Sequence, residues 1–216
     1  MNNFIDDLKA VYSKAGYIRI LDPHALEIGI RPGENVVVLS LIDAGRLTGH
    51  ICPAVTSAFF IVKSAIKELS PNEIPSREKF LVAVPKYDDM ALVFSYVLDA
   101  FPAPKDDSDA VPRMFLDKSL GNDKENVKFI FKNIDTDKTI CITWKKQVAM
   151  PPEIRQKMME YKNKKIREKY EYLDYLEWNT FINAQVERII NDSSANMLEI
   201  EEIDYTFPGQ MKMTLV

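Results

Sequence analysis

The apolar stripe in residues 55–69 constrains the fold of this chain more than any other feature. Its members recur at the i, i+3, i+4 and i+7 spacing of a helix with one buried face: Val55, Ala58, Phe59, Val62, Ala65, Ile66 and Leu69. The preceding segment 35–42 is β-branched and almost continuously apolar, which is typical of a buried strand. Together the two segments predict helices packed on a sheet, in a chain of 216 residues that can bury a sizeable core.

Shorter patterns predict the neighbouring elements. We expect a helix at 3–15, strands at 17–21 and 26–30, a further strand at 80–87 and a second helix at 90–101.

Two alternating segments, 127–133 and 139–145, predict a β-hairpin. Cross-strand pairing should place one set of apolar side chains on a shared face: Val127, Phe129, Phe131, Ile140, Ile142 and Trp144. Cys141 should then lie on the opposite face, as an ordinary sheet residue.

The Pro151-Pro152 pair marks a predicted boundary. Residues 1–150 are expected to form an α+β core domain, with a mixed sheet and helices packed on it. Residues 151–216 should form an appendage of two helices, to about 170 and 191, and a strand-like tail. The appendage carries a basic run that alternates with glutamates and is interpreted as a solvated helix face: Arg155, Lys157, Lys162, Lys164, Lys165, Arg167 and Lys169.

Composition argues against several classes of protein. A net charge of −4 gives no general attraction to nucleic acid or to an anionic membrane. No apolar run reaches the roughly 18 residues of a membrane span, and the acidic amino terminus does not resemble a signal peptide. With two cysteines and no C-x-x-C pair, we expect a reducing, cytoplasmic location. No glycine-rich phosphate loop is present among the 7 glycines, so no nucleotide cofactor is expected.

The segment RLTGHICPAV brings a histidine and a cysteine together at the start of the 55–69 helix. Pro53 suits the first helical position, which places Cys52 at the N-cap. The helix dipole and free amides there should lower the thiol pKa. His50 and Cys52 should face the same side of an extended loop, and both are good zinc ligands, but an open zinc site needs about three donors.

Asp88 and Asp89 could complete such a site. They follow the 80–87 strand, and both strand-to-helix junctions would meet at one sheet edge if the two strands run parallel and adjacent. The alternative is purely structural: Cys52 is a small buried residue, His50 a hydrogen-bonding loop residue, and the aspartates a helix cap.

Residues 35 to about 145 resemble the E-subunit family of formylmethanofuran dehydrogenase. The resemblance rests on a G-H-x-C-P motif after a strand, matched here by Gly49, His50, Cys52 and Pro53, and on the order of elements that follows. It implies an α+β core, often a homodimer, with a metal-associated His/Cys pocket.

The chain departs from that family at three places. Asp88-Asp89-Met90 stands where the family carries a second cysteine, and Leu120-Gly121-Asn122-Asp123 replaces a turn richer in glycine. No cysteine lies beyond Cys141, so the carboxy-terminal zinc module of many relatives is missing.

Three functions are consistent with these residues. The first is a zinc pocket of His50, Cys52 and Asp88 or Asp89 that binds or acts on a small molecule, with His50 and Cys52 catalytic if the protein is an enzyme. The second is a non-catalytic binding or assembly protein with a degenerate site. Its partner would dock on the appendage at Met158, Met159, Trp178 and Phe181, unless these side chains pack on the core or across a homodimer. The third is a metal-free Cys52 nucleophile with His50 as its base.

Overall fold

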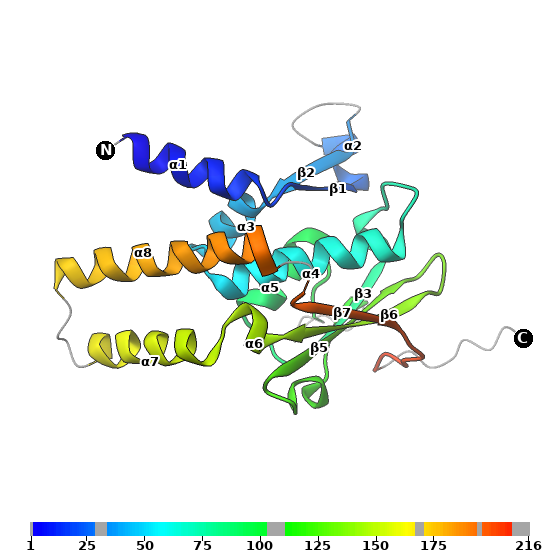
Figure 1. Cartoon of the computed structure of the whole chain (residues 1–216). Helices are drawn as coiled ribbons and strands as arrows, with labels where there is room; N and C mark the ends of the chain where they lie inside the picture. Colours follow the sequence, from blue (N-terminus) through cyan, green and yellow to red (C-terminus); the bar gives the residue numbers. More distant parts are fainter. Residues whose placement is uncertain (1, 29–33, 103–110, 167–170, 194–195, 209–216) are drawn as a thin grey trace, which may run out of the picture.

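The computed structural model describes residues 2–28, 34–102, 111–166, 171–193 and 196–208, and the fold is α+β (Figure 1). The elements are α1 (Asn2–Ser13), β1 (Tyr17–Leu21), α2 (Pro23–Ile28), β2 (Val36–Ser40), α3 (Leu41–Thr48), α4 (Pro53–Leu69), η1 (Arg77–Lys79), β3 (Phe80–Val84), α5 (Asp89–Leu98), β4 (Met114–Leu116), η2 (Lys118–Gly121), β5 (Asn126–Asn133), β6 (Thr139–Lys145), α6 (Lys146–Ala149), α7 (Pro152–Ile166), α8 (Tyr172–Arg188), η3 (Ile189–Ser193) and β7 (Leu198–Glu202).

The main sheet is mixed and has the strand order β4-β3-β5-β6-β7. Only the β3–β4 pair is parallel; the other pairs are antiparallel. The predicted hairpin is confirmed as β5–β6, and its register pairs Phe129 with Ile142 and Phe131 with Ile140. Cys141 pairs with Ile130 and lies on the opposite face, as expected.

Helices α4 and α5 pack side by side on one face of this sheet and bury its larger apolar cluster (Figure 1). Phe94 of α5 shows the contact most clearly, because its ring meets Phe129 and Phe131 edge to face at 5.2 and 5.3 Å. Such aromatic pairs stabilise a core beyond the burial of their surface. The predicted stripe on α4 is therefore the buried face that holds the helix on the sheet.

The strand predicted at 26–30 is wrong in its described part, which is the helix α2; residues 29 and 30 lie outside the described ranges. The local reason is a cap: Asp22 accepts a hydrogen bond from the His24 amide at 3.0 Å, and Pro23 suits a first helical turn.

The segment 35–42 forms a shorter strand than expected, because Ser40 ends β2 and caps α3, a helix that sequence reasoning did not predict. Ser40 and Asp43 form a capping box, which satisfies amides at both positions. Strand β2 pairs antiparallel with β1 in a separate two-stranded sheet. The expectation that β2 and β3 could lie parallel and adjacent is therefore wrong.

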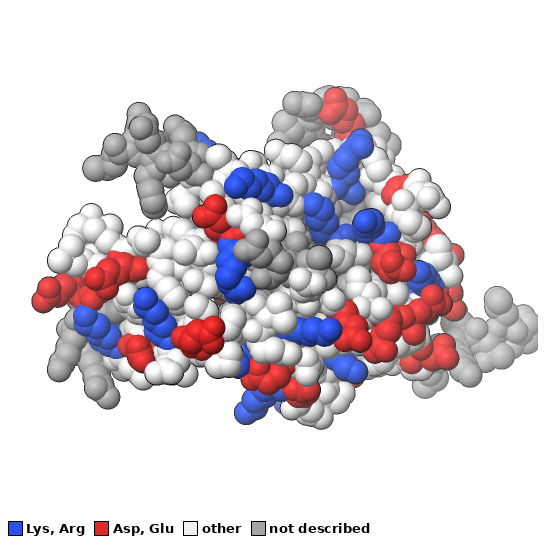
Figure 2. Space-filling view, viewed as in Figure 1, with Lys and Arg blue, Asp and Glu red and all other residues white. Residues whose placement is uncertain are grey.

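The carboxy-terminal residues complete the sheet and the core. Strand β7 pairs with β6, and Val186, Ile189 and Met197 are fully buried in the main cluster. Acidic side chains cover the exposed β7 edge (Figure 2), where Glu199 and Glu201 oppose further strand pairing. Residues 209–216, which include the predicted strand segment MKMTLV, lie outside the described ranges. Within those ranges, no helix is both long and apolar enough to cross a bilayer.

Candidate functional site

The helix N-termini of α4 and α5 bring the predicted site residues to one corner of the molecule. Gly49 ends α3 with φ of 77°, a left-handed conformation that glycine adopts without strain, and so turns the chain toward His50. Cys52 is the N-cap of α4, followed by Pro53 as predicted. Asp88 is the N-cap of α5 and Asp89 its first residue. Side-by-side packing of the two helices, and not adjacent parallel strands, causes this convergence.

His50 lies between a backbone carbonyl and a carboxylate. Its Nδ1 is 3.1 Å from the Thr48 carbonyl oxygen, which can only accept, so Nδ1 carries the proton. The other ring nitrogen, Nε2, lies 3.6 Å from Oδ2 of Asp89. That separation is longer than a direct hydrogen bond. Both side chains are about half exposed, so their electrostatic interaction is weakened by solvent.

Both carboxylate oxygens of Asp88 already have partners at the start of α5. Its Oδ1 accepts hydrogen bonds from the amides of Met90 at 3.0 Å and Ala91 at 3.3 Å. Its Oδ2 forms an ion pair with Lys86 at 2.8 Å. A metal ligand at this position would have to give up these interactions, so the structural interpretation of Asp88 as a helix cap is the one that the geometry favours.

The environment of Cys52 keeps its thiol protonated. Burial raises the pKa of the Cys52 thiol, and the nearby carboxylates of Asp89 and Asp88 raise it further. The amides of Val55 and Ala54 favour the thiolate but offset this only in part. The expectation that the helix N-terminus lowers this pKa is therefore wrong, because desolvation outweighs the dipole. No hydrogen bond joins Cys52 to His50 in the described part of the chain.

These donors do not form a metal site as they stand. Among the described residues, no three side chains of His, Cys, Asp or Glu come together in a way that could hold a metal ion. His50 and Asp89 do approach each other, with Nε2 and Oδ2 3.6 Å apart. A closed zinc site needs about four ligands and an open one about three, so uptake of zinc would require Cys52 or Asp88 to rearrange.

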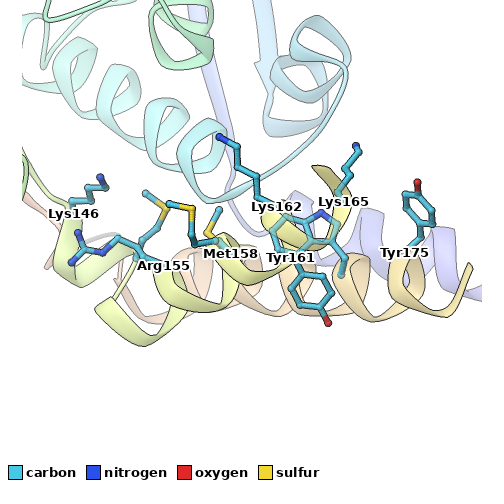
Figure 3. Close-up of a pocket in the computed structure, with 10 residues that line it drawn as sticks. Lys146, Arg155, Met158, Tyr161, Lys162, Lys165 and Tyr175 are labelled. Atoms are coloured by element: carbon cyan, nitrogen blue, oxygen red, sulfur yellow. The ribbon is translucent and has the colours of Figure 1, made fainter. Parts of the chain in front are cut away.

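A second candidate site lies in the helical region at the carboxy-terminal side, where a cavity of about 550 Å³ opens between α6, α7 and α8 (Figure 3). Its lining is Lys146, Met150, Arg155, Met158, Met159, Tyr161, Lys162, Lys165, Tyr175 and Trp178. The close ring contact between Tyr161 and Trp178, with centroids 4.9 Å apart, joins α7 to α8 at the cavity.

Methionine and aromatic side chains form most of the cavity wall, and basic groups lie around it. Figure 3 shows Lys146 and Arg155 at one end, and Lys162 and Lys165 projecting to the same side at the other. Arg155 is already paired with Glu125 through two contacts, at 2.6 and 2.9 Å.

Sequence reasoning found parts of this cavity without recognising it. Met158, Met159 and Trp178 are among the side chains expected to dock a partner, whereas Lys162 and Lys165 belong to the run interpreted as a solvated face. The lysines are indeed exposed. The missing information was the packing of α8 and α6 against α7, which brings the two sets of side chains to one cavity.

Comparisons of the chain with family models, with curated proteins and with solved structures give no match. The likeness to the formylmethanofuran dehydrogenase family therefore stays a prediction from the motif at Gly49–Pro53. The two candidate sites differ in geometry. Among the described residues, the corner at His50 does not bring three metal ligands together, whereas the cavity at α7 encloses about 550 Å³ with a mainly apolar lining.

Proposed function

We propose that this chain is a ligand-binding protein, and that its binding site is the cavity between α6, α7 and α8. The observation that supports this most is the cavity itself, about 550 Å³ with a largely apolar wall. Pockets for small ligands commonly have volumes of roughly 300–1,000 Å³, apolar walls and a few polar groups. The proposal is related to the alternative of a non-catalytic binding protein, but a small ligand in the cavity takes the place of a partner docked on the appendage.

The wall suits a ligand of irregular shape. Met150, Met158 and Met159 are unbranched and polarizable, so they adjust to different apolar surfaces. Trp178 and Tyr161 add flat aromatic area from two different helices. A flexible wall of this kind favours affinity for a class of apolar compounds over recognition of one rigid shape.

A neutral solvatochromic dye tests the proposal. We expect saturable binding with a blue shift of the dye emission. Met159→Glu should weaken binding at least about fivefold, because it places a charge in the apolar wall. Met159 is 57% exposed, so this substitution should leave the fold intact. Leu92→Glu, at an exposed position of α5 outside the cavity, is the matched control. Absence of saturable binding, or an equal loss in both variants, would contradict the proposal.

We propose as a second candidate function that the corner of His50, Cys52 and Asp89 binds zinc, as the family resemblance implies. The supporting observation is the Thr48 carbonyl at Nδ1 of His50, because metal-binding histidines are commonly oriented by such a partner and coordinate through the other nitrogen. Asp88 could join only by leaving its capping role.

Zinc titration of the purified protein tests this second candidate. We expect His50→Ala, Cys52→Ala and Asp89→Ala each to reduce zinc affinity by at least about tenfold. His24→Ala is the control, because His24 is the other histidine of the chain and is exposed outside the corner. Equal zinc binding by all four variants and the wild type would refute a zinc site at His50.

A further inference from the structure

We infer that the ligand of the α6–α8 cavity is a medium-chain acyl carboxylate, with its tail on the methionine and tryptophan wall and its carboxylate beside Lys162 and Lys165. This inference rests on the proposed function, because it names the class of ligand for the same cavity. The charges on α7, the composition of the lining and the adaptable methionine side chains support it.

Other basic residues on α7 already have partners. Arg155 is paired with Glu125, and Lys164 forms an ion pair and hydrogen bond with Asp174. Lys157 lies over the Phe181 ring, 4.7 Å from its centroid. Lys162 and Lys165, by contrast, form no ion pair with any residue in the described ranges. Among the described residues, they are the two ammonium groups of α7 that remain available to a ligand.

The position of these two lysines favours an anion between them. Lys162 and Lys165 are three residues apart on one helix, so they are neighbours on its surface and repel each other. Their side chains project to the same side in Figure 3, and their ammonium groups lean apart there, so both side chains would turn inward to reach one anion. A carboxylate placed beside both would remove the repulsion and gain two charge-assisted contacts.

The described lining residues of the cavity include no acidic side chain, although Glu125, outside the lining, pairs with Arg155. Four of the described lining residues are basic, namely Lys146, Arg155, Lys162 and Lys165, and none is Asp or Glu. Because Arg155 is paired with Glu125, the local excess of positive charge comes from the lysines, and it contrasts with the net charge of −4 of the whole chain. Electrostatic complementarity therefore favours an anionic ligand over a neutral or cationic one.

A single carboxylate on a flexible tail fits the cavity better than a polyphosphate. Two unpaired ammonium groups one helical turn apart suit one head group, whereas polyphosphates are usually held by several backbone amides at a glycine-rich loop or helix N-terminus. Three methionines line the same cavity and adapt to a chain of methylenes. Each methylene buried in the cavity adds to the affinity, so the tail would supply most of it.

Direct comparison of dodecanoate and dodecanol tests the inference, since the two share a tail and differ in head-group charge. Binding of labelled ligand is measured by equilibrium dialysis below the micellar range. We expect the wild type to bind dodecanoate at least about tenfold more tightly than dodecanol. The Lys162→Gln/Lys165→Gln variant should lose this preference. Lys118→Gln/Lys124→Gln, at exposed lysines outside the cavity, should keep it.

A salt titration of the wild type gives the same information without a substitution. Raising the salt from about 0.05 M to about 0.5 M should weaken dodecanoate binding several-fold and leave dodecanol binding almost unchanged. Equal affinity of the wild type for both ligands would overturn the carboxylate inference and leave the proposed binding function standing. Binding of neither ligand nor the neutral dye would overturn both.

Discussion

At the scale of single residues, the balance of burial and hydrogen bonding decides what Cys52 can do. A thiol at a helix N-terminus is commonly reactive, but here desolvation and two aspartates raise its pKa. The nucleophile hypothesis needs a thiolate near neutral pH and a base in contact with the sulfur. Neither condition is met in the described structure, where Cys52 is the N-cap residue of α4.

The pH dependence of thiol alkylation checks this statement. In a Cys141→Ala background Cys52 is the remaining thiol. We expect its reaction midpoint above the free value of about 8.5. Asp89→Asn should lower the midpoint, because it removes a negative charge that raises the pKa of the thiol. A midpoint well below 8.5 in the parent protein would instead indicate an activated cysteine.

At the scale of elements, local capping chemistry places His50. The Ser40–Asp43 capping box begins α3, and Gly49 ends it in the left-handed conformation. An added Cβ at Gly49 would meet no atom within 4 Å, so the requirement for glycine is conformational and not steric. The glycine of the G-H-x-C-P motif thus has a structural role that is independent of any metal.

Two substitutions at Gly49 test whether glycine is required there for its left-handed backbone conformation. Gly49→Ala should reduce the free energy of unfolding by about 1 kcal/mol, because alanine enters the left-handed region at that cost. Gly49→Asn should cost clearly less, since asparagine tolerates this region. Urea unfolding of the three proteins measures both values. Equal stability of the alanine variant and the wild type would contradict the explanation.

Sequence patterns predicted some elements well and others not at all, for identifiable reasons. The β5–β6 register follows from the face that Phe129 and Phe131 share, because a shift by one residue would move both rings away from the cluster under α4 and α5. Segment 26–30 has a similar apolar content but is governed by the Asp22 cap before it. The convergence of His50 with Asp89 was expected, yet for the wrong reason, because helix packing between α4 and α5 produces it.

At the scale of the whole molecule, the carboxy-terminal segment both completes the core and presents an apolar surface. Residues 151–216 include β7 and buried residues such as Val186, so deleting them would disrupt the fold. Point substitutions at the surface are therefore the better test of self-association. Exposed leucines near the start of α8 are suitable positions for such substitutions, since Leu173 and Leu176 are 66% and 47% exposed. We propose that the homodimer implied by the family resemblance forms through this surface.

Sedimentation equilibrium tests the dimer. We expect Leu173→Glu/Leu176→Glu to be monomeric under conditions in which the wild type is dimeric, because charge is added to an apolar contact. Val111→Glu/Ile134→Glu alters exposed apolar residues elsewhere and should stay dimeric. A monomeric wild type, or a dimer that survives the α8 substitutions, would refute this interface.

The cavity could not be predicted from the sequence because three elements build it. The lysines of α7, the aromatic groups of α8 and Lys146 of α6 meet only after α7 packs beside α8. The periodicity of a sequence describes one helix at a time, and by its own sequence α7 is a charged surface helix.

Methyl NMR of the protein labelled at its methionine methyl groups tests the binding site most directly. During a dodecanoate titration, we expect the signals of Met150, Met158 and Met159 to shift together and to saturate. Met90 and Met114, buried between α5 and the sheet, are internal controls that should stay in place. Unchanged signals at Met150, Met158 and Met159, or shifts confined to the other methionines, would contradict the assignment of the cavity as the ligand site.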